Sequence, residues 1–508
     1  MMNLSAGIAF HSKRTPGKPA IIFQDKPISY GDFHDRIMRM AGFLIAQGIG
    51  KGDVVALFMK NSPAFLEITF AASFIGAIFL PINYRLSPSE AEFILKDSGT
   101  KLLFVDDEFP GVAALPFQNI VLDERTRTDT RLLPGVAQAP AARMSVAKPD
   151  DLVRLMYTSG TTSRPKGVMH TYGNLHWKSI DHIVALGLSD REVLLTVGPL
   201  YHVGAFDLPG VAVLEMGGTL CMLREFGPED VLRSIQQHRI TGGWMAPIMV
   251  SRVLAMPDVA DYDVSSFRWC IAGGEKTPES RIRDFMRVFS HGRFIDAFGM
   301  TETCSGDTLM DAGMEIEKIG STGRATAHVE IRIADEHGNT LPPNTQGEIC
   351  IRGPKVTKGY WNAPEKTAES FYDDWLRSGD IGYLDDDGFL FLTDRSKDMI
   401  LTGAENVASQ EVESVIYQLP QVADVAVVGR PDEKWGERVV AVVVLKEGAS
   451  LSLDALTEHC RRSLAGFKVP RELVIATDLP RNPSGKVLKR VVRDQLKGGH
   501  PANSVADT

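Results

Sequence analysis

The chain has 508 residues, with 55 Lys and Arg against 64 Asp and Glu, which gives a formal net charge of −9. This length exceeds the usual size of one hydrophobic core and predicts at least two domains. The negative charge offers no general attraction to nucleic acids or to anionic membranes, so neither is expected as a partner.

The cysteines and the apolar segments indicate a soluble protein of a reducing compartment. The longest apolar stretch, residues 68–80, is too short to span a bilayer and is followed by Pro81, so no transmembrane segment is expected. No C-x-x-C pair occurs among the five cysteines, which are Cys221, Cys270, Cys304, Cys350 and Cys460. Neither a disulfide framework nor a zinc site is indicated, and a cytoplasmic location fits best.

Short runs rich in Val, Ile, Leu and Phe alternate with longer helical patterns from about residue 28 to residue 400. Such alternation is typical of an α/β fold in which helical crossovers join parallel strands. We expect strands at residues 54–58, 102–105, 152–157 and 193–197. A second unit begins near residue 397, with a helix at 410–418 and strands at 422–428 and 439–445.

The first functional candidate is the loop YTSGTTSRPKG, residues 157–167, which carries six hydroxyl side chains, two glycines and one lysine. Small side chains let backbone N–H groups approach phosphate oxygens, and Lys166 offers a cation for developing charge. The loop is not a Walker A motif, because Pro165 stands where that motif needs glycine. A solvated turn is the alternative. The candidate phosphate-binding residues are Thr158, Ser159, Gly160, Thr161, Thr162 and Lys166.

The second candidate is DAFGMTET, residues 296–303, which brings an aromatic ring, a glycine, a threonine and a carboxylate together. Phe298 could stack on a base, Thr301 could bind the α-phosphate, and Glu302 could hold Mg²⁺ through a hard oxygen ligand. A strand-to-helix turn with a capping threonine is the alternative. The further nucleotide-contacting candidates of this stretch are Asp296, Gly299 and Met300.

Two short motifs follow that suit a ribose. In WLRSGD the carboxylate of Asp380 comes after a glycine turn and can accept both ribose hydroxyls, although S-G-D is more often an ordinary turn. In DRSKDMI, Arg395 offers a fork of donors for ribose or phosphate. The pair Gly403 and Ala404 then permits close backbone approach.

The last motif is PRNPSGK, residues 480–486, a turn that ends in Lys486. It lies in a basic stretch, residues 468–497, which is either a solvated face or a surface that meets an anionic nucleotide. Beyond residue 498 the composition predicts disorder.

The order of these motifs over roughly 330 residues resembles the adenylate-forming superfamily. The similarity covers nearly the whole chain and looks closest to bacterial acyl-CoA synthetases of the fatty-acyl and the cinnamoyl or feruloyl kind. It implies an α/β fold with a large N-terminal domain of parallel sheets flanked by helices, residues 1–394. A small mobile α+β C-terminal domain, residues 395–497, and a disordered tail, residues 498–508, would follow.

The resemblance also implies an ATP-dependent carboxylate:CoA ligase that uses ATP, Mg²⁺ and coenzyme A. A carboxylate attacks the α-phosphate of ATP to form an acyl-adenylate, the C-terminal domain swings, and the CoA thiol attacks the acyl carbon. The expected substrate is a medium- or long-chain fatty acid or a cinnamate-type aromatic acid. Catalysis would rest on positioning and charge neutralisation rather than on a covalent nucleophile.

The positions of the family carry over residue by residue. Lys486 would bridge carboxylate and α-phosphate, while Thr158 and Glu302 would hold Mg²⁺. Asp380 with Arg395 would grip the ribose, and Gly274 with Glu275 would lie beside the adenine. Lys397 aligns with the hinge. The expected contacts of coenzyme A are Gly403, Ala404 and Glu405, as a wall for pantetheine, and Trp435, near the nucleotide.

His202, in PLYHVGAF, matches a family position between the acyl pocket and the pantetheine tunnel, although a lone histidine is more often a core residue. The small neighbours Gly204 and Ala205 predict that this wall of the pocket is open to a bulky acyl group. Residues 244–250 should supply other, largely apolar walls.

Three sites in the sequence depart from the family pattern. They are Ser163 in the phosphate loop, the pair Glu275 and Lys276, where relatives often have Ala-Pro beside the adenine, and Ala404, where many relatives have a second glycine. An enzyme that loads a carrier-protein phosphopantetheine, or stops at the adenylate, would keep every motif. A non-catalytic nucleotide-binding relative is disfavoured by the retention of Lys166, Glu302 and Lys486. A homodimer is possible, and the individual acid is left open.

Overall fold

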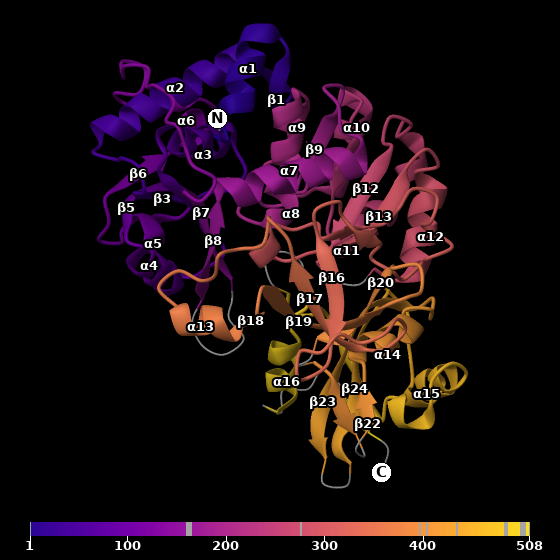
Figure 1. Ribbon diagram of the computed structural model, residues 1–508. Coiled ribbons are helices and arrows are strands. Elements are labelled where there is room, and N and C mark those ends of the chain that lie inside the picture. Colours follow the sequence, from indigo (N-terminus) through magenta and orange to yellow (C-terminus); the bar gives the residue numbers. More distant parts are fainter. Residues whose placement is uncertain are drawn as a thin grey trace.

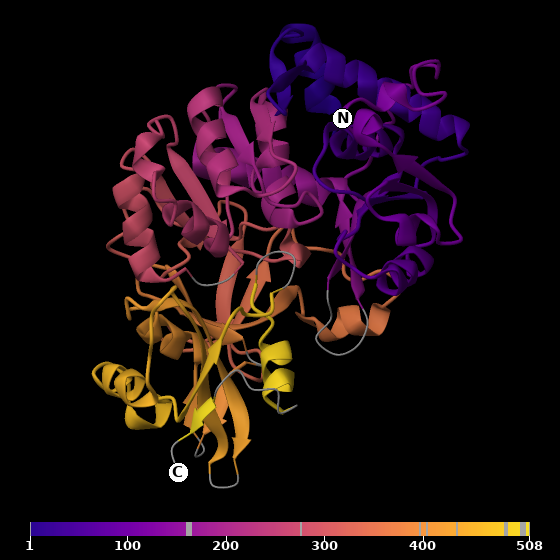
Figure 2. The same ribbon diagram turned by 180° about the vertical axis from the view of Figure 1, so that it is seen from behind.

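The computed structural model describes residues 2–158, 165–274, 277–395, 398–402, 405–432, 435–481, 486–497 and 504–506. Four β-sheets organise the chain. In both views the indigo N-terminal helices and the orange and yellow C-terminal strands lie at opposite ends of the molecule (Figure 1 and Figure 2).

The first sheet has the strand order β6-β5-β3-β4-β7-β8. Its first five strands pair in parallel, and β8 returns antiparallel to β7 as a hairpin. Every residue of β3 is buried, as expected for a central parallel strand covered on both faces. The strands are β3 (Val54–Phe58), β4 (Ile78–Pro81), β5 (Thr100–Asp106), β6 (Asn119–Leu122), β7 (Leu152–Thr158) and β8 (Lys166–Thr171).

The second sheet has nine strands in the order β15-β14-β13-β12-β11-β9-β10-β1-β2. Its centre, from β13 to β1, is parallel, and β2, β14 and β15 are antiparallel at the edges. The strands are β1 (Pro19–Phe23), β2 (Lys26–Ser29), β9 (Val193–Thr196), β10 (Thr219–Met222), β11 (Gly242–Trp244), β12 (Trp269–Gly273), β13 (Arg293–Phe298), β14 (Thr308–Leu309) and β15 (Arg324–Ala325).

Helices cover these sheets, and one apolar core joins them. Phe79 of β4, Leu175 of α7 and Ile271 of β12 belong to the same buried cluster. The longer helices are α1 (Ala6–Arg14), α2 (Tyr30–Ala46), α3 (Pro63–Ile75), α4 (Pro88–Asp97), α7 (Tyr172–Leu186), α9 (Gly210–Met216), α10 (Pro228–His238), α11 (Pro247–Leu254) and α12 (Glu279–Val288). The short ones are α5 (Pro110–Ala113), α6 (Glu124–Thr128), η1 (Thr130–Leu132), α8 (Val203–Phe206), η2 (Val259–Asp261), η3 (Thr301–Thr303) and α13 (Pro364–Glu369).

The third sheet is antiparallel, which differs from the α/β alternation expected as far as residue 400. It contains β16 (Glu330–Ala334), β17 (Gly347–Arg352), β18 (Phe371–Tyr372), β19 (Trp375–Leu384) and β20 (Leu390–Arg395). A short turn joins β19 to β20, in which the N–H of Gly388, at φ 79°, donates to the Asp385 carbonyl. Such a turn allows only antiparallel pairing, because a parallel pair needs a long crossover.

The fourth sheet forms the C-terminal unit. Its valine-rich strands pack into apolar clusters of their own. Its strands are β21 (Ile400–Thr402), β22 (Glu405–Val407), β23 (Val422–Asp432), β24 (Gly436–Leu445), β25 (Glu472–Ala476) and β26 (Ser504–Ala506). Its helices are α14 (Ser409–Ile416), α15 (Leu453–Arg461), η4 (Gly466–Lys468) and α16 (Lys489–Lys497).

The architecture expected from the sequence, a large N-terminal α/β part and a smaller C-terminal α+β part, is confirmed. The strand at 54–58 coincides with β3, and the other expected strands overlap β5, β7, β9, β23 and β24. The chain passes from the third to the fourth sheet between residues 395 and 400, beside the predicted hinge. In the tail expected to be disordered, residues 504–506 form β26, which pairs with the open edge of β25; the other tail residues lie outside the described residues.

Candidate functional site

The hairpin of β7 and β8 carries the predicted phosphate loop. Thr158, the last residue of β7, lies opposite Lys166, the first of β8. Both side chains are partly exposed. The intervening candidates Ser159, Gly160, Thr161 and Thr162, and the unusual Ser163, lie outside the described residues.

Tyr360 connects Lys166 with Glu302. The ammonium of Lys166 lies 5.4 Å from the centroid of the Tyr360 ring. The hydroxyl of the same tyrosine donates a hydrogen bond to Oε1 of Glu302 at 2.9 Å. Glu302 is buried, and its backbone carbonyl accepts a second bond from the N–H of Thr357 at 2.7 Å. The structure therefore brings together two predicted phosphate and metal ligands that come from separate elements.

The local charges act on these side chains in identifiable ways. Burial lowers the pKa of Lys166, with a further lowering from Lys366 and an opposing effect of Glu302. Burial raises the pKa of Tyr360, and the adjacent Glu302 carboxylate raises it further, so the hydroxyl keeps its proton and acts as a donor.

The segment that bears Thr301 and Glu302 is anchored from the hairpin. The ring Nε2 of His170, in β8, lies 2.7 Å from the Thr301 carbonyl, and Arg154 of β7 donates to His170 Nδ1 at 2.9 Å. Just before this segment, a Cβ at Gly299 would lie 2.4 Å from the backbone nitrogen of Gly306. Glycine is required there because the two backbones touch.

Asp296 and Phe298 of β13 are buried, and Met300 precedes η3. Phe298 packs in an apolar cluster with Val329, just before β16, and Ile333 of β16. Stacking of its ring on a base stays a prediction. Gly274 follows β12 at φ 96°, a conformation that favours glycine. Glu275 and Lys276 lie outside the described residues.

The predicted ribose ligands are neighbours. Asp380 of β19 and Arg395 of β20 lie directly opposite each other in the antiparallel pair. The N–H of Asp380 donates to the Ser378 hydroxyl at 3.0 Å, which holds the turn before the carboxylate.

His202 lies beside Trp244, and this contact corrects one expectation. The two rings stack with centroids 6.0 Å apart. A Cβ added at Gly204 would lie 2.6 Å from the Trp244 ring, and one at Gly198 would lie 2.5 Å from it. The sequence suggested that the small residue at 204 leaves room for a bulky acyl group. In the structure, the indole of Trp244 occupies that space instead.

His202 is held as a neutral ring. Its Nδ1 accepts the N–H of Gly204 at 3.0 Å, which caps α8 and leaves the ring proton on Nε2. Burial lowers the pKa of His202 to about 4, against an opposing effect of Asp207. The arrangement gives a neutral N–H donor at the edge where β9 and β11 end, and in parallel sheets ligands bind beyond the carboxyl ends of strands.

The C-terminal candidates are described only in part. Lys486 is partly exposed and precedes α16. Trp435 packs against its own domain, with the guanidinium carbon of Arg471 4.4 Å from the ring centroid. Glu405 opens β22, while Lys397, Gly403 and Ala404 lie outside the described residues.

The oxygen set at Thr158 and Glu302 suits Mg²⁺ that arrives with a nucleotide, because such a site uses one or two protein oxygens and the phosphates supply the rest. The buried carboxylate of Glu302, oriented by Tyr360, is such a hard ligand. Among the described residues, no group of three or more His, Cys, Asp or Glu side chains is arranged to hold a metal ion by itself.

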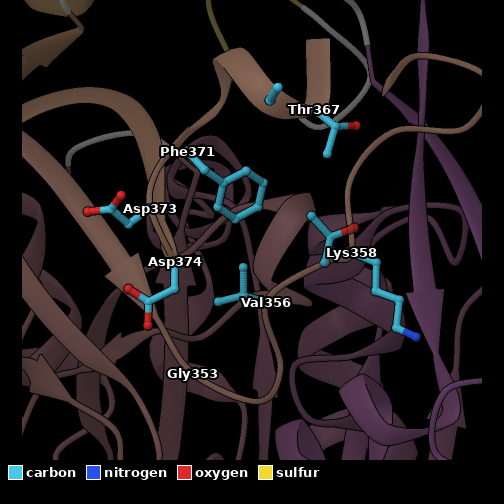
Figure 3. Close-up of a pocket in the computed structure, with 9 residues that line it drawn as sticks. Gly353, Val356, Lys358, Thr367, Phe371, Asp373 and Asp374 are labelled. Carbon is cyan, nitrogen blue, oxygen red and sulfur yellow. The ribbon is translucent and has the colours of Figure 1, made fainter. Parts of the chain in front are cut away.

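A cavity of about 530 Å³ lies next to this region (Figure 3). Asp374 and Lys358 lie on different sides of the cavity, with Phe371 and Val356 between them. None of the predicted ligands is among the described residues that line it. We place the candidate site at Lys166, Tyr360 and Glu302 instead, because the groups able to bind phosphate and metal converge there.

Comparison with known proteins identifies the family of the chain. Residues 8–361 match the family model "AMP-binding enzyme", and residues 411–486 match "AMP-binding enzyme C-terminal domain". The chain belongs to the AMP-binding enzyme family. Within this family it belongs to the acyl-CoA synthetase branch of adenylate-forming enzymes. Like the relatives of that branch, it is an AMP-forming ligase.

Two curated relatives have related activities. The enzyme is 36% identical over 493 residues to a feruloyl-CoA synthase of Amycolatopsis sp, covering 95% of this chain and 96% of the relative. It is 35% identical over 489 residues to the long-chain-fatty-acid–CoA ligase FadD13 of Mycobacterium tuberculosis (strain ATCC 25618 / H37Rv), covering 94% and 95%.

One solved structure shows the same fold with a reaction intermediate. The o-succinylbenzoate CoA synthetase (MenE) from Bacillus subtilis, in complex with the acyl-adenylate intermediate OSB-AMP, superposes with a TM-score of 0.87 at 30% identity. The match covers 98% of this chain and 99% of that one.

Sequence reasoning missed Tyr360 and His170. Tyr360 lies in a Gly-Tyr-Trp run, which is typical of ordinary packing, and His170 lies in a short strand-like run outside every motif. The sequence did contain one signal, since β7 and β8 place Arg154 and His170, both polar, at buried positions of a hairpin.

Proposed function

We propose that this enzyme is an ATP-dependent carboxylate:CoA ligase with its adenylation site at Lys166, Tyr360 and Glu302. The observation that carries the proposal is that Lys166 lies over the Tyr360 ring while Glu302 accepts a hydrogen bond from its hydroxyl. Tyr360 thereby joins the phosphate hairpin to a carboxylate from a separate element. The family and the acyl-CoA synthetase relatives supply the reaction class.

In the first step a carboxylate oxygen of the acid bonds to the α-phosphorus of ATP, and the bond to pyrophosphate breaks. Mg²⁺, when bound, neutralises phosphate charge. Lys166 and Lys486 would do the same from the protein side, and Thr301 would position the α-phosphate. Asp380 and Arg395 would hold the ribose.

In the second step the CoA sulfur bonds to the acyl carbon and AMP leaves, with the thiol proton lost to solvent. His202 would direct its Nε2 proton to an acyl oxygen. The proposal also includes the change of domain orientation between the two steps, with a domain boundary at 394–395 and a hinge at Lys397. Coenzyme A would be bound by a pantetheine wall at residues 403–405 and by a contact at Trp435.

The acid is a fatty or an aromatic carboxylic acid. Trp244, which fills the space beside Gly198 and Gly204, favours a compact aromatic acid over a long chain. A cytoplasmic location fits five free, buried cysteines, and within the described part of the chain no helix is both long and apolar enough to cross a membrane. A homodimer stays a prediction for light scattering to test.

The test is release of AMP and pyrophosphate across short, medium, long-chain and aromatic acids, each with and without CoA. CoA-dependent turnover with one class of acid supports the ligase and identifies the class. Pyrophosphate exchange without CoA turnover indicates a carrier protein as acceptor or an adenylate as product. If none of the acids gives a reaction, the proposal is contradicted.

A further inference from the structure

A buried polar chain runs beneath the candidate site and connects its parts. Arg154 binds the Asp207 carboxylate with two bonds, Nη1 to Oδ1 at 3.0 Å and Nη2 to Oδ2 at 2.7 Å. Its Nε donates a hydrogen bond to Nδ1 of His170, and Nε2 of His170 is hydrogen-bonded to the Thr301 carbonyl. Arg154, Asp207 and His170 are each 0% exposed.

The direction of each bond follows from the atoms. Arg154 has no acceptor, so Nδ1 of His170 must accept, and the carbonyl of Thr301 can only accept, so Nε2 must carry the proton. The ring is thus a neutral relay with a fixed tautomer. Burial lowers the pKa of His170 well below its usual value, and the charge of Arg154 lowers it further, which agrees with this assignment.

The chain is firmly built at its far end. Asp207 closes α8, the helix that His202 opens, and its backbone carbonyl accepts from Nζ of Lys178 at 3.0 Å. The guanidinium carbon of Arg154 lies 5.9 Å from the ring centroids of both Phe79 and Phe206. A bidentate pair between aromatic rings has little freedom, so the position of Nε is set by packing.

The segment at the near end needs such an anchor. After η3, Cys304 and Ser305 take φ values of 57° and 69°, a left-handed conformation that is unfavourable for non-glycine residues. Lys355 holds the following turn, donating to the carbonyls of Ser305 at 2.9 Å and Gly306 at 2.7 Å. His170 holds the preceding turn from the phosphate hairpin.

We propose that His170, oriented by the Arg154–Asp207 pair, is a positioning residue that fixes Thr301 and Glu302 relative to the phosphate hairpin for nucleotide binding and adenylation. This inference rests on the proposed function for its adenylation effect. Because His170 and Arg154 are fully buried, they act through the backbone of Thr301 and do not touch substrate.

Three substitutions separate the two bonds of the relay. His170→Gln offers an acceptor and a donor at the two ends of an amide and keeps both bonds. His170→Asn is one methylene shorter, so it keeps the acceptor for Arg154 and loses Thr301. His170→Met has a similar volume and keeps neither. The control is His11→Met, which removes a buried histidine bonded to the Glu215 carbonyl at 2.9 Å, between α1 and α9.

The experiment measures ATP·Mg²⁺ affinity by calorimetry, the Mg²⁺ dependence of pyrophosphate release, and thioester formation from supplied acyl-AMP. We expect His170→Asn and His170→Met to weaken ATP·Mg²⁺ binding about 10-fold and to slow adenylation by about 10–100-fold, as for loss of one hydrogen bond to the site. Thioester formation should stay within about 3-fold, and His170→Gln and His11→Met should match the wild type in all three.

Unchanged ATP·Mg²⁺ affinity in both His170→Asn and His170→Met would overturn the inference, as would equal impairment in His170→Gln. If His170→Met does not fold, His170→Asn against His170→Gln decides the matter. Should no acid release pyrophosphate in the wild type, the proposed function fails, and the calorimetric comparison still decides the positioning of the nucleotide site.

Discussion

The hydroxyl of Tyr360 donates a hydrogen bond to Oε1 of Glu302 at 2.9 Å. This contact orients a buried carboxylate that the proposed mechanism uses as a metal ligand. A hydrogen bond to a charged group is worth about 1.5–3 kcal/mol, so its loss should be visible in the rate.

The first prediction concerns this bond. Tyr360→Phe keeps the ring beside Lys166 and removes the hydroxyl, so we expect pyrophosphate release to slow by about 10–100-fold and to need more Mg²⁺. The measurement is initial rate against Mg²⁺ concentration. Tyr417→Phe, which removes a tyrosine–carboxylate bond to Asp424 in the C-terminal sheet, is the control. An unaltered Mg²⁺ dependence in Tyr360→Phe would show that Glu302 needs no such orientation.

The second prediction concerns Lys486. Lys486→Ala should abolish adenylate formation, because the charge of the transferring phosphate loses its main protein cation, and should largely spare thioester formation from supplied acyl-AMP. The two half-reactions are measured separately. Lys497→Ala, at an exposed lysine of the same basic stretch, should leave both unchanged. Equal loss of both half-reactions in Lys486→Ala contradicts the assignment.

The third prediction concerns Asp380. Asp380→Ala should raise the KM for ATP by about 10-fold, because a carboxylate that accepts two ribose hydroxyls contributes at least one charged hydrogen bond. Steady-state kinetics at saturating acid measures this. Asp386→Ala, an exposed carboxylate just beyond β19, is the control. A KM equal to that of the wild type removes Asp380 from the ribose site.

The fourth prediction concerns the indole beside His202. Gly204→Ala places a methyl 2.6 Å from Trp244 and should destabilise the enzyme by about 1–3 kcal/mol. Trp244→Leu should shift the kcat/KM preference toward longer or bulkier acids, and the double variant should recover stability lost in Gly204→Ala. Thermal unfolding and kcat/KM over a chain-length series test both parts. If Trp244→Leu leaves the preference unaltered, Trp244 does not line the acyl pocket.

The fifth prediction concerns acid stability. Burial lowers the pKa of both His170 and His182 well below the usual value. In the unfolded chain a histidine binds a proton near pH 6.5, whereas the buried histidine of the folded protein stays neutral there. The free energy of unfolding therefore falls as the pH drops below about 6.5. From pH 7.5 to 5.5 each histidine contributes a loss on the order of 1 kcal/mol.

Urea unfolding at pH 7.5 and 5.5 tests this. His170→Gln should reduce the loss of stability by roughly 1 kcal/mol relative to the wild type. Buried carboxyls whose pKa is raised by burial, such as Glu67, have the opposite sign and are present in both proteins, so they cancel in the comparison. His291→Gln, at an exposed histidine, should leave the loss as in the wild type. An undiminished loss in His170→Gln would mean that the folded ring accepts a proton.

The sequence by itself determined the family, the α/β character and the order of the motifs. Local chemistry is enough for these, since β3 is apolar at every position and the phosphate loop has a distinctive composition. It also predicted Asp380 and Arg395 as ribose ligands; the register of β19 and β20 places the two residues opposite each other, and the ribose role stays a prediction.

Only the tertiary structure decided which residues support the site. Tyr360 and His170 contact Glu302 and Thr301 through strands and turns that are distant in sequence, and no local pattern encodes such contacts. The surroundings of Gly204 were likewise decided only by the tertiary structure. From the sequence, its small size predicted space for the substrate. The folded chain fills that space with Trp244, because the packing of β11 against α8, and not the residue itself, determines what lies beside a glycine.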